Sequence, residues 1–274
     1  MNIKRAHKYI GIPILTLLAT LSLAPLLWLI VSAVTPQTFL LQIPPSLSLK
    51  TISFENFQKL FEISTIPRWF FNSLYLSLIN TFNSVMIATY GGFIFAKINF
   101  KGKKLLFMII LSSLMIPFHV TLIPSFLILK SLKLTDTHLA LILPALVNVF
   151  GLFLMRQAIS TFPQEILDQA RIDGASEMDI FLKIIIPLAK SQMFVLAILT
   201  FVAQWNSFLW PLIVLNRSKL FTIQVGLATL QDQFLTDYGI LMAGAFITSL
   251  PVILVFFLFS RYLTKGIFAG AIKS

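Results

Sequence analysis

The segment EILDQARIDGASEMDIFLKIIIP, from Glu165 to Pro187, is an acidic stretch in an otherwise apolar chain. It holds five of the ten acidic residues of the protein, in a sequence of 274 residues of which 57% are apolar. Acidic side chains are costly in hydrocarbon, so this stretch predicts contact with water or with another protein. We therefore expect membrane-spanning segments on both sides of it.

The composition is that of an integral membrane protein. Charged residues make up 11% of the chain, Phe occurs 27 times and the mean hydropathy is +0.90, which excludes an ordinary soluble domain. A spanning helix needs roughly 20 apolar residues, and the long uncharged runs supply six such segments. We expect a single all-α membrane domain over residues 1–274, with spans at about 9–34, 70–96, 105–129, 138–157, 191–215 and 239–263.

The distribution of Lys and Arg predicts the orientation. With the N-terminus inside, the predicted inner segments carry 14 of the 21 Lys and Arg residues and the outer segments carry 7. Basic residues gather on the cytoplasmic side of spanning helices, so both termini and the acidic segment are predicted to lie in the cytoplasm at a prokaryotic plasma (inner) membrane. The net charge of +11 is then a topology signal, and we expect no nucleic-acid partner.

The first apolar run poses the question of a cleaved signal peptide. It is much longer than the roughly 7–15 apolar residues of a signal-peptide core, so we expect a retained first helix.

Local signals divide the acidic segment into two short helices. Thr161 with Gln164 three residues later indicates a capped helix start. Gly174 is expected to end that helix in a left-handed conformation, which glycine adopts without strain. Ser176 with Asp179 three residues later resembles a second capping box. The pattern predicts a helix, a tight turn and a second helix.

The second of these helices has an apolar face. Met178, Phe181, Ile184 and Ile185 fall at helical spacing, and Pro187 is expected to end the helix. Such a face either lies on the bilayer surface or enters a pocket of another protein.

One set of residues in the acidic segment has a characteristic order and spacing: Ala170, Asp173, Gly174, Ala175, Ser176, Ile186 and Pro187. This set resembles the EAA-loop motif of binding-protein-dependent ABC importer permeases. The stretch from Arg171 to Ser176 is most similar to the sugar-importer branch, the maltose and glycerol-phosphate type. Further matches along the chain are Arg68-Trp69, Asn72-Ser73, Met115-Ile116-Pro117, Trp205-Asn206, Trp210-Pro211, Pro251, Gly266 and the tail Gly270-Ala271-Ile272-Lys273.

The resemblance implies the six-helix type I permease fold, with a cytoplasmic helix-turn-helix coupling loop at about residues 159–189 that docks in a groove of a separate ATPase. One departure concerns the docking contact. Where the family usually has Glu-Ala-Ala, this chain has Asp168-Gln169-Ala170, which keeps the charge on a shorter arm. The implied ATPase-coupling residues are Asp168, Gln169, Ala170, Asp173, Gly174, Ala175, Met178, Phe181 and Pro187.

The resemblance also implies the partners. They are a homologous second permease, two cytoplasmic ABC ATPase subunits, an extracytoplasmic solute-binding protein and the lipid bilayer. ATP and Mg would be bound by the ATPase, so this chain is expected to carry no cofactor, no metal site and no catalytic residue.

Polar residues inside the predicted spans are candidates for the solute path, because an unpaired polar group in lipid is costly. Amides beside aromatic rings are a common way to hold a sugar. Packing between helices is the alternative explanation for each of them. The candidate path residues are Gln204, Asn206, Trp210, Asn83 and Asn148.

We therefore expect a non-catalytic permease subunit of an ATP-driven importer for a sugar or related polyol. The alternatives are the same kind of permease for a non-sugar solute, such as a phosphodiester, polyamine or peptide, and a secondary transporter. The predicted spans contain no Asp or Glu, which weighs against a proton-coupled carrier. The sequence has no Walker glycine loop, no Gly-x-Ser-x-Gly elbow and no Cys, so an enzyme is not expected.

Overall fold

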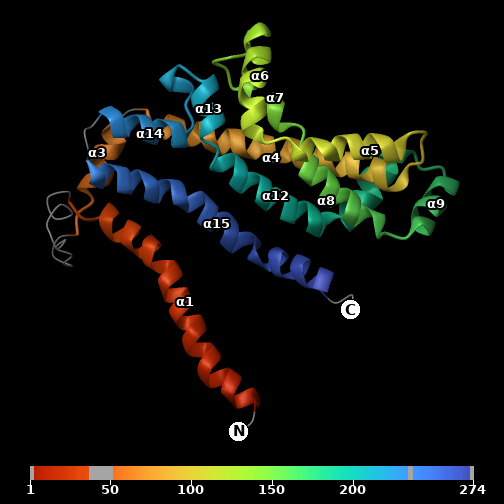
Figure 1. Cartoon of the computed structure of the whole chain (residues 1–274), viewed down its shortest axis with the longest axis horizontal. Coiled ribbons are helices and arrows are strands. Elements are labelled where there is room, and N and C mark those ends of the chain that lie inside the picture. The colour runs from red at the N-terminus through yellow and green to blue at the C-terminus, as the bar shows by residue number, and fades with distance from the viewer. Residues whose placement is uncertain (1–2, 37–51, 64, 234–236, 272–274) are drawn as a thin grey trace. The chain divides into compact units, whose positions relative to one another are not determined.

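The computed structural model describes residues 3–36, 52–63, 65–233 and 237–271. All regular secondary structure in these ranges is helical, which confirms the predicted all-α class (Figure 1). Residues 37–51 of the predicted first outer loop, and Ile272 and Lys273 of the predicted tail, lie outside the described residues.

The chain divides into two compact units. Unit 1 combines residues 1–68 with 226–250, and unit 2 combines residues 69–225 with 251–274. The helices that run through the unit boundaries are α4 (Ile66–Lys97), α14 (Ile223–Gln233) and α15 (Tyr238–Ala271).

Unit 1 joins the end of α1 (Ile3–Ala33) to α3 (Glu55–Glu62). The buried Asn56 amide donates hydrogen bonds to the carbonyls of Ala33, at 3.1 Å, and Thr35, at 2.9 Å. A Cβ atom at Gly239 would lie 2.4 Å from the Asn56 side chain, so α15 passes close to this amide. Most apolar side chains of α1 between Ile12 and Ile30 are exposed, which requires hydrocarbon or another protein around this part of the helix.

Unit 2 is built on α4 and the helices that follow it. α8 packs against α5 and α12, and α13 packs against α6 and α7. One core lies among α4, α8 and α12, where Phe93, Met155 and Leu196 are buried. The helices of this part are α5 (Lys103–Ser112), η2 (Ser113–Met115), α6 (Phe118–Ser131), α7 (Leu139–Ala145), α8 (Val149–Ser160), α12 (Lys190–Trp205), α13 (Leu209–Val214) and η4 (Ser218–Leu220).

Four helical segments of the described chain are long and apolar enough to cross a membrane, and the number rises to six if each of two bent pairs is one span. The first, second and sixth predicted spans coincide with the long helices α1, α4 and α15. The other predicted spans are interrupted, each at a position with a local cause.

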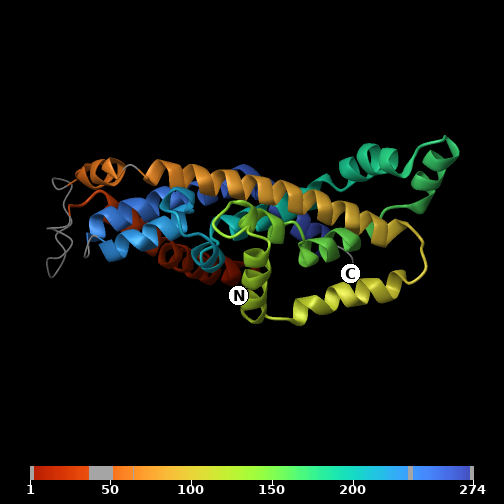
Figure 2. The same ribbon diagram turned by 90° about the horizontal axis from the view of Figure 1, so that it is seen from above.

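The span expected at 105–129 contains a corner of 102° between Met115 and Phe118 (Figure 2). Ile116 and Pro117 there are extended, with ψ values of 115° and 138°. A proline lacks the N–H of the helical ladder and disfavours helical geometry in the residue before it, so the helix stops and restarts.

Two further interruptions divide the predicted spans at 138–157 and 191–215. α7 ends at Ala145 and α8 begins at Val149, with the extended Asn148 between them. α12 ends at Trp205, and α13 begins four residues later at Leu209. An amide residue lies at each interruption, Asn148 at the first and Asn206 at the second.

The helices α4 and α8 cross at very short distance. A Cβ atom added at Gly92 of α4 would lie 2.8 Å from the Met155 Cβ and 2.8 Å from the Arg156 backbone nitrogen. No other residue fits without displacement of the α8 backbone, so glycine sets the distance between the two helices.

We expect Gly92→Ala to destabilise the protein by roughly 1–3 kcal/mol, the usual cost of overpacking a core. Gly11→Ala is the matched control, because nothing lies within 4 Å of a Cβ atom there. Thermal unfolding in detergent should give a lower midpoint for the first variant only. Equal midpoints for the two variants would contradict the close crossing of α4 and α8.

Candidate functional site

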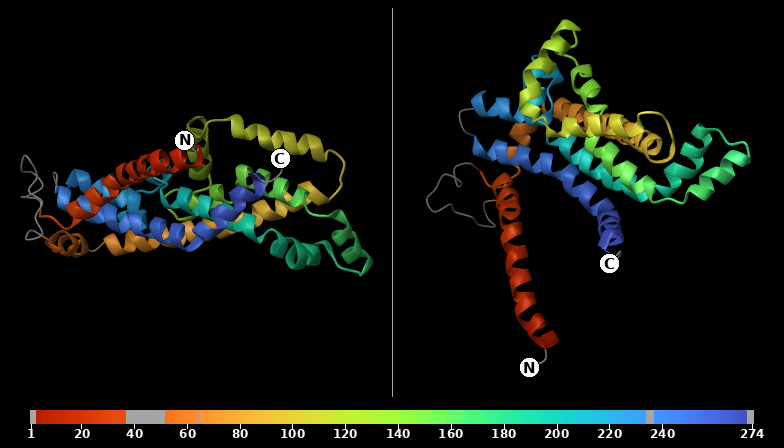
Figure 3. Two further views of the ribbon diagram at one scale, coloured as in Figure 1. Left: turned by 90° about the horizontal axis from the view of Figure 1, so that it is seen from below. Right: turned by 45° about the vertical axis from the view of Figure 1, so that its right-hand side comes forward.

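The acidic segment forms α9 (Gln164–Ile172) and α10 (Glu177–Ile180), followed by the π-helical turn η3 (Phe181–Ile185) and α11 (Ile186–Leu188). This segment lies at one end of unit 2, beyond the end of α4 (Figure 3). It holds five acidic residues and is attached to the rest of unit 2 by two helices, α8 and α12.

The turn between α9 and α10 depends on Gly174. Its φ of +85° is left-handed, a conformation that glycine adopts without strain. The Gly174 N–H bonds the Arg171 carbonyl at 3.1 Å, and the Ala175 N–H bonds the Ala170 carbonyl at 2.9 Å. This pair of bonds is a Schellman motif, which closes the C-terminus of α9 and sends the chain back at once.

The start of α10 has the predicted capping box. The Ser176 hydroxyl accepts the Asp179 N–H, and the Asp179 carboxylate accepts the Ser176 N–H. Hydrogen bonds from the Lys183 ammonium and the Ser176 hydroxyl lower the pKa of Asp179 to about 2. This carboxylate is therefore charged throughout the physiological pH range.

The start of α9 differs from the prediction. Thr161 does not cap α9, because its hydroxyl donates to the Ala158 carbonyl at 2.8 Å and so belongs to the end of α8. The N-cap position is Pro163, which makes no side-chain bond. Proline fixes the backbone before the first turn, so α9 begins without a side-chain cap.

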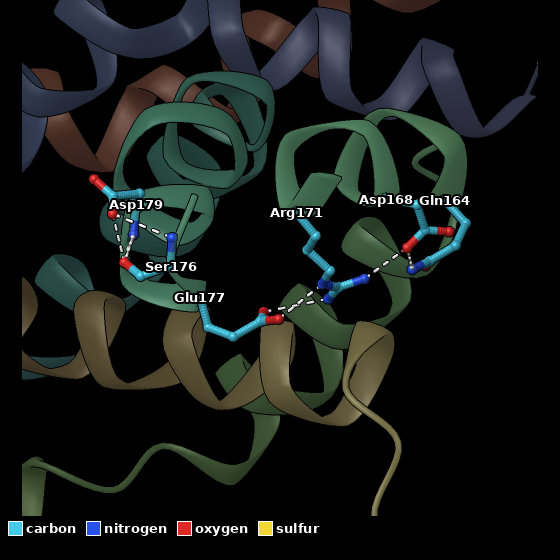
Figure 4. A network of polar contacts seen from close by, with 6 residues as sticks. All are labelled: Gln164, Asp168, Arg171, Ser176, Glu177 and Asp179. Carbon is cyan, nitrogen blue, oxygen red and sulfur yellow. Dashed lines mark hydrogen bonds and ion pairs between the residues drawn. The ribbon is translucent and has the colours of Figure 1, made fainter. Parts of the chain in front are cut away.

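Arg171 connects the two short helices (Figure 4). Its guanidinium donates to Asp168 of α9 at 2.7 Å and to both carboxylate oxygens of Glu177 of α10 at 2.8 and 3.2 Å. The bond to Glu177 raises the pKa of Arg171. A two-pronged bond of this kind fixes direction as well as distance, so Arg171 sets the angle between α9 and α10.

The inner side of the segment is anchored in the core of unit 2. Leu167 of α9 and Ile180 and Ile185 after the turn are fully buried. They belong to one apolar cluster with side chains of α4, α8 and α12. The segment is therefore a rigid extension of these helices.

The expectation that Phe181 lies on an exposed face with Met178 is wrong. Phe181 is 4% exposed, whereas Met178 is 50% exposed. The Phe181 ring packs against Tyr90, with centroids 4.9 Å apart, and against Phe93 at 6.0 Å. Two aromatic partners on α4 hold this ring inside, because aromatic contacts add to the energy of burial.

Pro187 does not end its helix. α11 continues to Leu188, and the chain bends by 78° only between Leu188 and Lys190. The Ile186 N–H bonds the carbonyl of Phe181 five residues back, so the helix is already widened into a π-turn at this point. The wider turn accommodates the proline ring.

The outer side of the segment carries an exposed crest at the turn. Ile172 is 85% exposed and stands beside the exposed Asp173 and Gly174. Ile172 was not among the predicted contact residues, although an apolar residue between Arg171 and Asp173 was a visible signal. Of the other predicted coupling residues, Asp168, Gln169 and Pro187 are exposed, and Ala170 and Ala175 are half-buried.

Lys97, at the end of α4, holds the connection that leads into α9. Its ammonium donates to the Phe162 carbonyl at 2.6 Å and to the Ser160 carbonyl at 3.5 Å. Sequence reasoning assigned Lys97 to topology alone. The structure gives it a second role, as a link between α4 and the acidic segment.

Two of the five predicted path residues, Gln204 and Trp210, line one small polar hollow of about 30 Å³. Asn80 donates to the Gln204 side chain at 3.2 Å, and Trp210 donates to the Ala140 carbonyl at 3.0 Å. Buried Asn80 Oδ1 and Thr222 Oγ1 have no protein partner there. The space suits a water molecule and is much too small for a sugar.

The other three path candidates lie apart from this hollow. Asn148 caps α8: its Oδ1 accepts the Gly151 N–H at 2.8 Å, and its Nδ2 donates to the Thr200 hydroxyl at 3.4 Å. Asn206 is exposed at the end of α12, and Asn83 is half-buried in α4. The bonds of Asn148 favour the helix-packing alternative for that residue.

We expect Asn148→Ala to destabilise the protein by roughly 0.5–2 kcal/mol, because α8 loses its N-cap. Asn83→Ala removes the same side chain from a mid-helix position and serves as control. Thermal unfolding of the two variants measures the difference. A midpoint for Asn148→Ala that equals the control would show that the cap contributes nothing.

Comparison with known proteins gives a consistent result. Residues 88–268 match the family described as binding-protein-dependent transport system inner membrane component. The chain is 37% identical over 272 residues to the arabinooligosaccharides transport system permease protein AraQ of Halalkalibacterium halodurans, with 95% of this chain and 98% of that protein covered. It is 31% identical over 270 residues to the lactose transport system permease protein LacG of Rhizobium radiobacter, with 98% of each covered.

One solved structure has the same fold. It is a chain of a bacterial ABC transporter involved in the import of the acidic polysaccharide alginate, with a TM-score of 0.84 over 96% of this chain and 98% of that chain. The two sequences are 20% identical, so the match bears on the fold alone. It confirms the predicted importer-permease fold.

Proposed function

The chain belongs to the family of binding-protein-dependent transport system inner membrane components, and we propose that it forms half of the membrane pathway of an ATP-driven importer for a sugar or related polyol. The support for a sugar is that the two relatives, both covered almost completely, are named for an arabinooligosaccharide and for lactose. The alternative is a non-sugar solute, and a transport assay with both kinds of solute would distinguish the two.

The observation that carries the coupling role is the exposed crest on a rigid base. Ile172 and Met178 present apolar surface on either side of Gly174, while Arg171 fixes the angle between the helices that bear them. An exposed apolar crest rimmed by charges is typical of a protein docking surface. In the proposal, this crest enters a groove of a separate ATPase subunit.

A force applied at the crest has a direct route to the membrane helices. Leu167, Ile180 and Phe181 connect it to the core shared by α4, α8 and α12. Lys97 adds a polar link from α4 to the chain before α9. Since close-packed interiors transmit displacement, closure of the ATPase dimer on ATP would move these helices together.

The rest of the machinery would be separate chains. The proposal includes a homologous second permease, two cytoplasmic ABC ATPase subunits that bind ATP and Mg, and an extracytoplasmic solute-binding protein. The acidic segment and both termini would then face the cytoplasm. This chain would supply transmission and a path, and no catalytic residue.

For the solute path, we propose the surroundings of Gln204 and Trp210. These residues carry an amide and an aromatic ring on helices that break at Asn206. A break in a helix exposes backbone carbonyls to a cavity, which is where transporters bind solutes. The 30 Å³ hollow would have to widen in the outward-open state.

Gly174→Pro is expected to abolish uptake while the protein still inserts, because proline requires a φ near −65° and the turn needs +85°. Gly174→Asn is the matched control. Asparagine tolerates the left-handed conformation, and nothing lies within 4 Å of a Cβ atom at this position. Uptake by vesicles with equal amounts of each variant is the measurement.

Wild-type uptake by Gly174→Pro would refute the coupling role. Loss of uptake in both variants would instead show that transport requires the absence of a side chain at position 174.

Affinity purification of the tagged chain in mild detergent tests the proposal as a whole. We expect an ATPase and a second six-helix permease to co-purify. We also expect the complex to hydrolyse ATP, and Gly174→Pro to uncouple this hydrolysis from transport. An intact chain that purifies without an ATPase in several detergents would refute the importer proposal.

A further inference from the structure

A large hollow lies at the junction of α4, α5 and α8, and its lining includes no residue of the acidic segment or of the proposed path. Its volume is about 1060 Å³. The apolar part of its lining contains Phe95, Phe107, Met108, Leu111 and Phe153. The polar part contains Lys103, Lys104 and Arg156, so one hollow combines a hydrocarbon-like floor with a cationic rim.

The aromatic floor is ordered by ring contacts. Phe95 lies 5.3 Å from Phe107 and 5.8 Å from Phe100, measured between ring centroids. The Arg156 guanidinium carbon lies 4.9 Å from the Phe107 centroid, within cation–π distance. This contact holds the guanidinium at the edge of the floor.

The charges of the cationic rim are not paired within the described part of the chain. Among the residues that the structure describes, no Asp or Glu forms an ion pair with Lys103, Lys104 or Arg156. Lys103 donates hydrogen bonds to the backbone carbonyls of Ala96 and Ile98. The first turn of α5 contains no acidic residue either. Three cations gathered without a counter-charge repel one another, and an anion between them would relieve this cost.

Arg156 gives the most specific signal. Its Nη1 donates to Gln157 at 3.2 Å. The side chain is half-buried and lines the hollow, and no carboxylate of the described residues pairs with it. A guanidinium without a carboxylate partner favours an anion such as a phosphate beside it.

From this combination we propose that the hollow is a binding site for an anionic phospholipid, with the phosphate against Lys103, Lys104 and Arg156 and an acyl chain along the phenylalanine floor. The inference rests on the proposed topology, which puts the loop before α5 at the cytoplasmic headgroup level. Basic pockets between helices on this side of a membrane suit anionic headgroups. A free phosphate would satisfy the cations and leave the apolar floor bare, so the lining favours a lipid.

Native mass spectrometry of the full chain, extracted with its partners from vesicles containing equal phosphatidylglycerol and phosphatidylcholine, tests the site. We expect the wild type to retain phosphatidylglycerol in preference. Lys104→Gln/Arg156→Gln should reduce the retained ratio roughly 30-fold, since each basic side chain near an anionic headgroup contributes roughly fivefold.

The control variant is Lys130→Gln/Lys219→Gln, which removes the same charge from exposed positions that do not line the hollow. It should keep the wild-type ratio. Lys104→Gln alone, at an exposed position, should give roughly a fivefold loss if the double variant does not fold. Equal losses in the test and control variants would overturn the site, because bulk charge would then explain retention.

A separate arm adds inorganic phosphate to the extracted wild type. Retention of phosphatidylglycerol at millimolar phosphate supports a lipid site, and complete displacement would overturn it in favour of a free-anion site. The lipid ratio is read without ATP. Failure of the ATPase to co-purify would therefore count against the importer proposal and leave this inference standing.

Discussion

Burial of the acidic segment's inner side chains against α4, α8 and α12 is the interaction on which the rest of the structure depends. Leu167, Ile180 and Ile185 are fully enclosed, and the two aromatic residues of α4 enclose Phe181. Without this apolar attachment, a segment with five acidic residues would be a solvated loop. With it, the charged side chains stay at the surface while the buried ones belong to one close-packed core with α4, α8 and α12.

The polar contacts of the acidic segment have a different effect on the structure from the apolar contacts. Exposed ion pairs such as Arg171–Asp168 contribute little to the free energy of unfolding. The main effect of this network is therefore on the orientation of α9 and α10 relative to each other. Arg171 reaches across a turn that Gly174 makes possible, and Ser176 begins the next helix immediately. These three local features, each recognisable from a few residues of sequence, together set the angle between α9 and α10.

Much of this could be predicted from the sequence because the signals are local. The apolar runs predicted a helical membrane protein, Gly174 predicted the left-handed turn, and Ser176 with Asp179 predicted the capping box. What could not be predicted depends on distant partners. Phe181 lies inside because Tyr90 and Phe93 are there, which no periodicity within residues 165–187 contains.

The interrupted helices also combine features that local sequence predicts with features that depend on distant residues. Pro117 was visible in the sequence, but a proline inside a long apolar run is compatible with a kink as well as with a corner of 102°. Asn148 was recognised as a polar residue within a span, while its bond to Thr200 on another helix was beyond local reasoning. The assignment of a solute path from amides alone suffers from this limit, since caps and packing use the same side chains.

The π-turn from Phe181 to Ile185 has a consequence for the length of this part of the chain. A π-turn holds one residue more than an α-helical turn, so it accommodates an extra residue without changing the rotation of the helix on either side of it. Deletion of one residue here would restore an ordinary α-helical turn and leave the crest facing as it does. Deletion of one residue within the regular part of α12 would instead rotate the crest by about 100° relative to the rest of that helix. The π-turn is therefore a place where the segment can lose one residue while the crest keeps its direction.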